Sequence, residues 1–295
     1  MIDLHPWGDL NTNNPSEAKI CIMGVPFDGA VSCGKGAAEA PEKLRDLSRY
    51  LPATTETGII LDNLKVYDMG DIAIDLNWER YYKEVEDQAY NLIAEKKFTL
   101  FIGGDHSVTI PLQKAFGRYF KEKGNQKVGI IHFDSHADIC DIYDSHKWSH
   151  ACTERRAIED VIEPKDLAYV GLRGFEIDEL EYFQEHPDIL IMKARDVYMD
   201  GYMACYKRLE ERFKDYDAVY FTLDIDVVDP AFAPGTGTPE AGGMTSREIM
   251  EFVKLIVGNL PIKTMDLVEV SPPLDQRNNI TSWLALNVSA KEMLL

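Results

Sequence analysis

Three short segments of this 295-residue sequence place histidine or aspartate directly after an apolar run. The segments are residues 103–107, 134–138 and 224–226, and the apolar runs before them are 98–102, 128–133 and 218–223. Such runs of β-branched and aromatic residues are typical of strands that are buried on both faces. In open α/β sheets, ligands bind beyond the carboxyl ends of the strands. We therefore expect the polar side chains of the three segments to converge at one edge of a sheet.

Six side chains in these segments have the chemistry of metal ligands: His106, Asp134, His136, Asp138, Asp224 and Asp226. Residues two apart on an extended backbone point to the same side, so the ligands of each segment can face one site. Four aspartates at one place repel one another unless cations neutralise them. Oxygen-rich ligands with two imidazoles and no thiolate favour manganese, magnesium or another hard divalent ion, and two such ions activate water. The sequence therefore predicts a dinuclear metal hydrolase, whereas Asp229, before Pro230, is expected to be a turn residue.

Strand-like runs alternate with amphipathic helical patterns along the rest of the chain, which predicts an α/β fold with a mostly parallel sheet covered on both faces. Strands are expected at 19–24, 98–102, 128–133, 167–171, 189–192, 218–223 and 263–270. Helices are expected at 79–96, 108–120, 176–185, 202–214, 246–257 and 279–295. Glycine and proline predict rim loops at 28–41 and 230–239. No linker or repeat divides the chain, so we expect one domain over residues 1–295.

The composition argues against several classes of function. A formal net charge of −19 disfavours nucleic acid and anionic membranes as partners and is compatible with a small cationic substrate. The sequence has no run of about 18 apolar residues and its first residues do not resemble a signal peptide, so neither a membrane span nor export is expected. Five cysteines without paired spacing indicate reduced thiols and a cytoplasmic protein.

In four segments the sequence resembles the ureohydrolases, the arginase–agmatinase family, and it is most similar to the agmatinase branch. The matching segments are 103–107, 133–138, 224–239 with 242–243, and 266–273, in order along nearly the whole chain. The resemblance implies an arginase-like three-layer α/β/α sandwich, two Mn²⁺ ions per chain or other divalent ions in their place, no other cofactor, and a homotrimer or homohexamer. It also implies that His106 binds one ion and His136 the other. Asp134 and Asp224 would bridge both ions, and Asp138 and Asp226 would each complete one.

The same resemblance assigns catalytic residues. Ser149-His150 followed by Arg155-Arg156-Ala157 is similar to the family's S-H-G-x-x-F-R-R-A segment, which implies that His150 passes a proton to the departing amine. His146 is the competing candidate for this role. Glu269 would accept hydrogen bonds from the substrate guanidinium, unless it forms an ion pair with Arg277 instead. Asp138 is counted with the catalytic residues as well as with the ligands.

Departures from the family pattern bear on the substrate. Cys140 stands where arginases have an asparagine that reads the amino-acid end of arginine, and residues 34–38 replace the usual R-P-G-A-R-like run. We therefore expect hydrolysis of agmatine to urea and putrescine, with guanidinobutyrate or another small guanidine as the alternative. A metallophosphoesterase is disfavoured because its G-N-H-D/E motif is absent. A non-catalytic metal-binding relative is also disfavoured, because all six ligand positions are intact.

Overall fold

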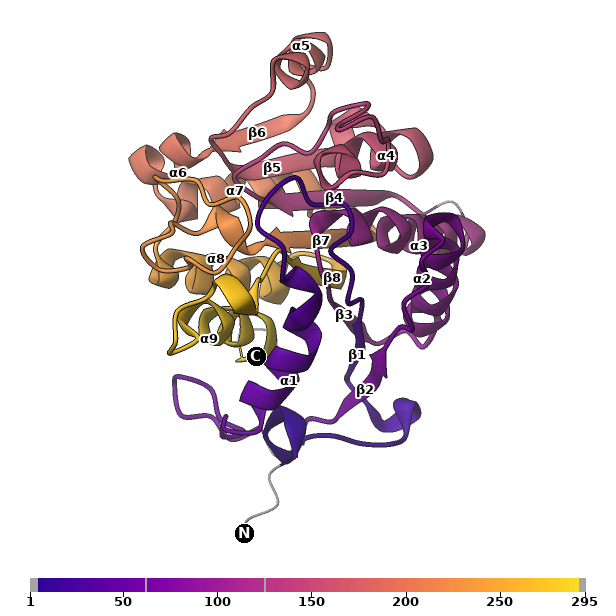
Figure 1. Ribbon diagram of the computed structural model, residues 1–295, viewed down its shortest axis with the longest axis vertical. Helices are drawn as coiled ribbons and strands as arrows, with labels where there is room; N and C mark the ends of the chain where they lie inside the picture. The colour runs from indigo at the N-terminus through magenta and orange to yellow at the C-terminus, as the bar shows by residue number, and fades with distance from the viewer. Residues whose placement is uncertain (1–4, 62, 125, 292–295) are drawn as a thin grey trace.

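A computed structural model describes residues 5–61, 63–124 and 126–291 of the chain. Its centre is an eight-stranded sheet with the order β2-β1-β3-β8-β7-β4-β5-β6 (Figure 1). The strands are β1 (Ile20–Gly24), β2 (Val66–Asp71), β3 (Phe98–Ile102), β4 (Val128–Phe133), β5 (Leu167–Leu172), β6 (Leu190–Lys193), β7 (Ala218–Asp224) and β8 (Ile262–Val268). Every pairing between these described strands is parallel, so all their carboxyl ends lie along one edge of the sheet.

Both faces of the sheet are apolar, because successive side chains along a strand point to opposite sides. In β7, Val219, Phe221 and Leu223 belong to one hydrophobic cluster. Ala218 and Tyr220 of the same strand belong to the other cluster, on the opposite face. This alternation of buried residues explains why the central strands read as unbroken apolar runs in the sequence.

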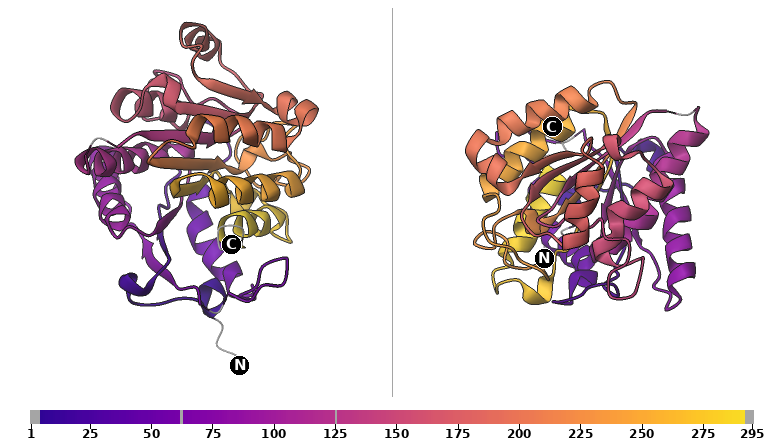
Figure 2. Two further views of the ribbon diagram at one scale, coloured as in Figure 1. Left: turned by 180° about the vertical axis from the view of Figure 1, so that it is seen from behind. Right: turned by 90° about the horizontal axis from the view of Figure 1, so that it is seen from above.

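Helices cover both faces and complete a three-layer α/β/α sandwich (Figures 1 and 2). The helices of one layer are α2 (Trp78–Ala94), α3 (Thr109–Glu122) and α4 (Thr153–Asp160), with α5 (Ile177–Glu185) beside them. The helices of the other layer are α1 (Ala40–Ser48), α6 (Ala194–Asp200), α7 (Tyr202–Phe213), α8 (Ser246–Asn259) and α9 (Ile280–Leu286). Among the described residues, none of these helices is long and apolar enough to cross a membrane.

The predicted α/β architecture is confirmed, and the seven expected strands lie within two residues of their predicted ends. Strand β2 was missed because it lies at the sheet edge and is half-exposed, so its sequence Val-Tyr-Asp-Met-Gly-Asp has no apolar run. The short helices α1, α4 and α6 were also missed. The helix expected at 279–295 is wrong in its length: α9 ends at Leu286, residues 287–291 form a π-helical turn, and 292–295 lie outside the described residues.

The strand order brings together segments that are far apart in the sequence. Strands β3, β8, β7 and β4 are neighbours, so the residues that follow them meet at the centre of the sheet edge. These are the three polar segments of the sequence together with Glu269, which follows β8. The fold therefore places the predicted ligands and Glu269 at one site.

Candidate metal centre

The turn after β3 fixes the backbone of His106. A Cβ at Gly104 would lie 1.7 Å from the carbonyl oxygen of Phe27, so only glycine lets the turn pass this close to the start of the following loop. This loop covers residues 28–36 and is shorter than the predicted 28–41, because a 3-10 turn begins at Ala37. Asp105 caps the following 3-10 turn by accepting a hydrogen bond from Ser107 N at 3.0 Å, and its other oxygen accepts one from Ala30 N at 2.8 Å. Asp105 therefore ties the rim loop to the site.

Both nitrogens of the His106 ring have polar neighbours. Its Nε2 lies 2.9 Å from Thr222 Oγ1, which sets the orientation of the ring. The other nitrogen, Nδ1, faces three carboxylate oxygens, those of Asp134 at 3.0 Å, Asp138 at 3.1 Å and Asp224 at 3.2 Å. This Nδ1 is buried and has no well-aligned hydrogen-bond partner among the described residues. A buried nitrogen aimed at a group of carboxylates is the arrangement that a cation would complete.

His136 faces a second group of carboxylates. Its Nδ1 lies 3.1 Å from Asp226 Oδ2 and 3.5 Å from Asp134 Oδ1. The main chain orients the two carboxylates, because Asp134 accepts a hydrogen bond from His136 N at 2.6 Å and Asp226 accepts one from Ser135 N at 3.0 Å. Asp224 is held in the same way by Asp226 N at 2.8 Å.

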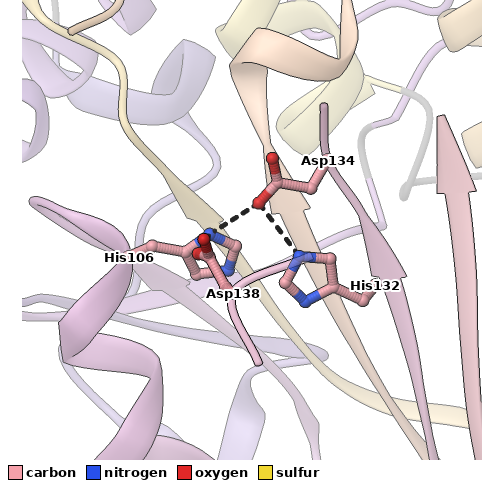
Figure 3. Close-up of side chains that lie close together, drawn as sticks. All are labelled: His106, His132, Asp134 and Asp138. Atoms are coloured by element: carbon pink, nitrogen blue, oxygen red, sulfur yellow. Dashed lines mark hydrogen bonds and ion pairs between the residues drawn. The ribbon is translucent and has the colours of Figure 1, made fainter. Parts of the chain in front are cut away.

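The two groups share one residue. In the first, ligand atoms of His106, His132, Asp134 and Asp138 lie within 4.8 Å of one another (Figure 3). In the second, the same holds for Asp134, His136 and Asp226. Asp134 belongs to both, so its carboxylate lies between the two groups of candidate ligands. The structure thus brings all six predicted ligands together.

The carboxylates of this cluster repel one another and shift each other's pKa values, and a bound cation would offset this repulsion. Burial and then repulsion from Asp226 and Asp134 raise the pKa of Asp224 well above its ordinary value. Burial and repulsion from Asp134 also raise the pKa of Asp226. Burial alone would lower the pKa of His136, but the carboxylates of Asp134 and Asp226 raise it to about 12. The six predicted ligands, four carboxylates and two imidazoles with no thiolate, fit hard divalent ions.

Removal of divalent ions is therefore expected to destabilise the fold. Without ions the buried carboxylates repel one another, whereas an ion at about a hundred times its Kd stabilises the folded state by about 2.7 kcal/mol. This corresponds to a fall in Tm of several degrees for a chain of this size. Calorimetry of protein treated with EDTA, and again after addition of excess Mn²⁺, measures the change. An identical Tm with and without ions would contradict a metal centre in the folded state.

His150 and Glu269 lie together beside the cluster. Glu269 accepts a hydrogen bond from His106 N at 2.8 Å and does not pair with Arg277, the alternative that the sequence left open. Its Oε1 lies 3.9 Å from His150 Nδ1. His150 Nε2 lies 3.0 Å from Ser32 Oγ, so the 28–36 loop holds the ring from the other side. His146, the competing candidate, packs against Trp78 with ring centroids 4.7 Å apart. The structure thus places His150, not His146, next to Glu269.

Backbone strain also marks this site. Asp138 has a φ of 48° and Glu269 a φ of 60°, both in the left-handed region that side chains other than glycine rarely adopt. Such conformations cost about 1–3 kcal/mol each and cluster at functional sites. Asp229, by contrast, is a turn residue as predicted: its carboxylate accepts hydrogen bonds from Ala231 N at 2.9 Å and from Gly242 N at 2.7 Å.

A cavity of about 230 Å³ opens next to the cluster. His136, Asp138 and His150 of the candidate site line it, together with Ser32 of the 28–36 loop and Thr238 of the 230–239 loop. The other lining residues are Tyr143, Ala151, Gly174, Phe175, Glu176, Glu179 and Glu240, of which Glu176 and Glu240 are exposed. Both loops that the sequence predicted at the rim therefore contribute to the cavity.

Sequence reasoning missed two residues behind the cluster. His132 is fully buried in β4, and its Nε2 lies 2.9 Å from Asp134 Oδ2. Its Nδ1 lies 2.7 Å from Oε1 of Glu154, which is also fully buried, in α4. Burial lowers the pKa of His132, but Asp134 and Glu154 raise it to about 9. Two features of the sequence could have indicated these residues. His132 is a histidine inside an apolar strand, and Glu154 stands where the S-H-G-x-x-F-R-R-A pattern has phenylalanine.

Comparisons with known proteins agree with this geometry. The family model described as "Arginase family" matches residues 18–295. The guanidinobutyrase of Pseudomonas aeruginosa is 34% identical over 273 residues, which cover 90% of this chain and 83% of that protein. The agmatinase of Bacillus cereus is 32% identical over 285 residues, which cover 95% of this chain and 92% of that protein.

A solved structure shows the same fold. The agmatine ureohydrolase of Thermoplasma volcanium superposes with a TM-score of 0.86 at 26% identity, covering 100% of this chain and 94% of the other. The family match spans the three polar segments, the 230–239 loop and Glu269. The protein therefore belongs to the arginase family and is a ureohydrolase, which cleaves a C–N bond of a guanidino compound.

Proposed function

We propose that the protein is a manganese-dependent agmatinase, which hydrolyses agmatine to urea and putrescine. The cavity beside the cluster carries this proposal. Its lining includes the exposed carboxylates of Glu176 and Glu240 and the rings of Tyr143 and Phe175, and none of its described lining residues is lysine or arginine. Carboxylates and aromatic faces attract an ammonium group, whereas an acid tail would need a cationic partner.

The residues of the site divide the reaction between them. The six proposed ligands are His106, Asp134, His136, Asp138, Asp224 and Asp226, and two divalent ions bound there would activate a water molecule for attack on the guanidinium carbon. Glu269 would accept hydrogen bonds from the guanidinium and hold it in place. His150, which lies beside Glu269 and lines the cavity, would deliver a proton to the departing amine nitrogen.

A cation beside Glu269 would favour the ionised form of its carboxyl group. Burial and then repulsion from Asp105 raise the pKa of its carboxyl group well above the ordinary value. A guanidinium beside it would favour the charged form and gain a charge-assisted hydrogen bond. The binding of substrate and the ionisation of Glu269 would therefore support each other.

Manganese is proposed as the physiological ion because the donor set is rich in oxygen and has two imidazoles. We also propose one domain, a homotrimer or homohexamer as the family resemblance implies, and a cytoplasmic location. All five cysteines are free thiols, as is usual in a reducing compartment. Polyamine biosynthesis, in which putrescine is consumed, would be the pathway served.

One observation favours guanidinobutyrate as the alternative substrate. Lys193 Nζ lies 5.4 Å from the centre of the Phe175 ring, so a cation lies close to one residue that lines the cavity. The similarity to the guanidinobutyrase of Pseudomonas aeruginosa points in the same direction. An acid tail would, however, also face Glu176 and Glu240, which repel it.

Agmatine is expected to be a better substrate than arginine. The α-carboxylate of arginine would meet the carboxylates of Glu176 and Glu240 without a cationic partner, which costs about 1–3 kcal/mol, or about 5- to 150-fold in kcat/KM. Urea release from agmatine, arginine and 4-guanidinobutanoate, with Mn²⁺ added, measures the difference. A kcat/KM for arginine equal to or above that for agmatine would contradict the agmatinase assignment. A kcat/KM for 4-guanidinobutanoate above both would establish the alternative.

A further inference from the structure

A chain of buried polar side chains runs from α3 to the candidate metal centre. Gln113 Nε2 donates a hydrogen bond to Glu154 Oε1 at 2.9 Å. The same oxygen accepts a hydrogen bond from His132 Nδ1 at 2.7 Å, and His132 Nε2 lies 2.9 Å from Asp134 Oδ2. All four residues have no exposed surface. The chain ends on the one carboxylate that the two groups of candidate ligands share.

We propose that Glu154 is a positioning residue: by accepting a hydrogen bond from His132 it aims that ring at Asp134, and so controls how tightly the centre holds divalent ions. The inference rests on the proposed role of Asp134 as a ligand. The ring of His132 is packed between His106 and Tyr169. The hydrogen bond from His132 Nδ1 to Glu154 fixes which nitrogen faces Asp134. Outer partners of this kind set the orientation of the groups that bind metal.

The position of Glu154 supports a role beyond packing. Its backbone N–H donates to Asp138 O at 2.9 Å, so Glu154 is linked to a second candidate ligand through the main chain. Its other carboxylate oxygen, Oε2, is buried and has no hydrogen-bond partner among the described residues. A buried carboxylate with one oxygen unpaired costs stability. A leucine would fill the same space without that cost, so the hydrogen bond to His132 is the feature that leucine would not supply.

Calorimetric titration of metal-free protein with Mn²⁺ tests the proposal without any substrate. Glu154→Leu is expected to weaken Mn²⁺ binding by about 10- to 100-fold, the usual effect of losing such an outer partner. Glu154→Gln keeps an oxygen that can accept from His132 Nδ1, so it is expected to recover most of the lost affinity. Glu86→Leu is the matched control, because Glu86 is a buried glutamate of α2 that pairs with Arg118 away from the centre. Its Mn²⁺ affinity should equal that of the wild type.

The outcomes separate this inference from the proposed function. Wild-type protein that binds no Mn²⁺ would overturn the metal centre itself. If the wild type binds Mn²⁺ and Glu154→Leu binds it with the same affinity, only the positioning role is overturned. The same holds if Glu154→Gln binds Mn²⁺ as weakly as Glu154→Leu. If Glu154→Leu does not fold, Gln113→Leu removes the other hydrogen bond to the same oxygen. A smaller loss of affinity in that variant supports the proposal, and an unchanged affinity overturns it.

Discussion

Replacing Asp134 or Asp224 with alanine is expected to remove both divalent ions from each chain and to abolish urea release. Asp134 Oδ2 lies 3.0 Å from His106 Nδ1, while its Oδ1 lies 3.5 Å from His136 Nδ1, so one carboxylate serves both halves of the cluster. Asp224 Oδ2 lies 3.2 Å from the same nitrogen of His106, and the family resemblance implies that Asp224 also bridges the ions. Loss of a bridging ligand would remove a contact to each ion and also the negative charge that holds the pair together. Metal analysis of the dialysed variants measures the bound ions.

Asp229→Ala is the matched control for this pair of variants. Asp229 lies close in sequence to Asp224, yet its carboxylate accepts hydrogen bonds from loop N–H groups. This control should retain two ions even if its loop becomes less stable. Two ions in both Asp134→Ala and Asp224→Ala would show that the centre has other bridging groups or lies elsewhere.

Glu269→Gln is expected to keep both ions but to lower kcat/KM by about 10- to 100-fold. The amide is nearly isosteric and still offers an oxygen to His106 N, so the local backbone should persist. It loses the negative charge opposite the guanidinium, and a hydrogen bond to a charged group contributes about 1.5–3 kcal/mol. Through the transition-state relation this energy corresponds to the stated loss of rate.

Steady-state urea release and metal content are to be measured on the same preparation of Glu269→Gln. Glu248→Gln serves as the control for the amide substitution, because Glu248 caps α8 away from the site. An unchanged kcat/KM in Glu269→Gln would remove Glu269 from substrate binding. Loss of metal in this variant would instead assign it to the support of the centre.

The sequence of a single segment was sufficient to predict the central strands and the start of one helix. The central strands β3 and β4 match the predicted residues because strands buried on both faces are continuously apolar. The start of α8 also matches the predicted residue, and Thr245 and Glu248 form a capping box there. Strand β2 gave no such signal, because an edge strand with one exposed side is free to carry polar residues.

The six candidate ligands were predictable as a set, since each lies directly after an apolar run and carries a metal-binding side chain. The contacts of these ligands with other residues were not predictable. Glu269 contacts His106 only because β8 lies between β3 and β7, although the two residues are 163 positions apart. His132 and Glu154 are likewise joined only by the packing of α4 on the sheet.

The sequence by itself thus determined the chemistry of the ligands and the strands that carry them, because these depend on residue type and on burial along one segment. Strand order, and the walls of the cavity with its carboxylates at Glu176 and Glu240, were decided only by the tertiary structure. These features depend on contacts between segments distant in the sequence. The local pattern of a segment does not specify which other segments will pack against it.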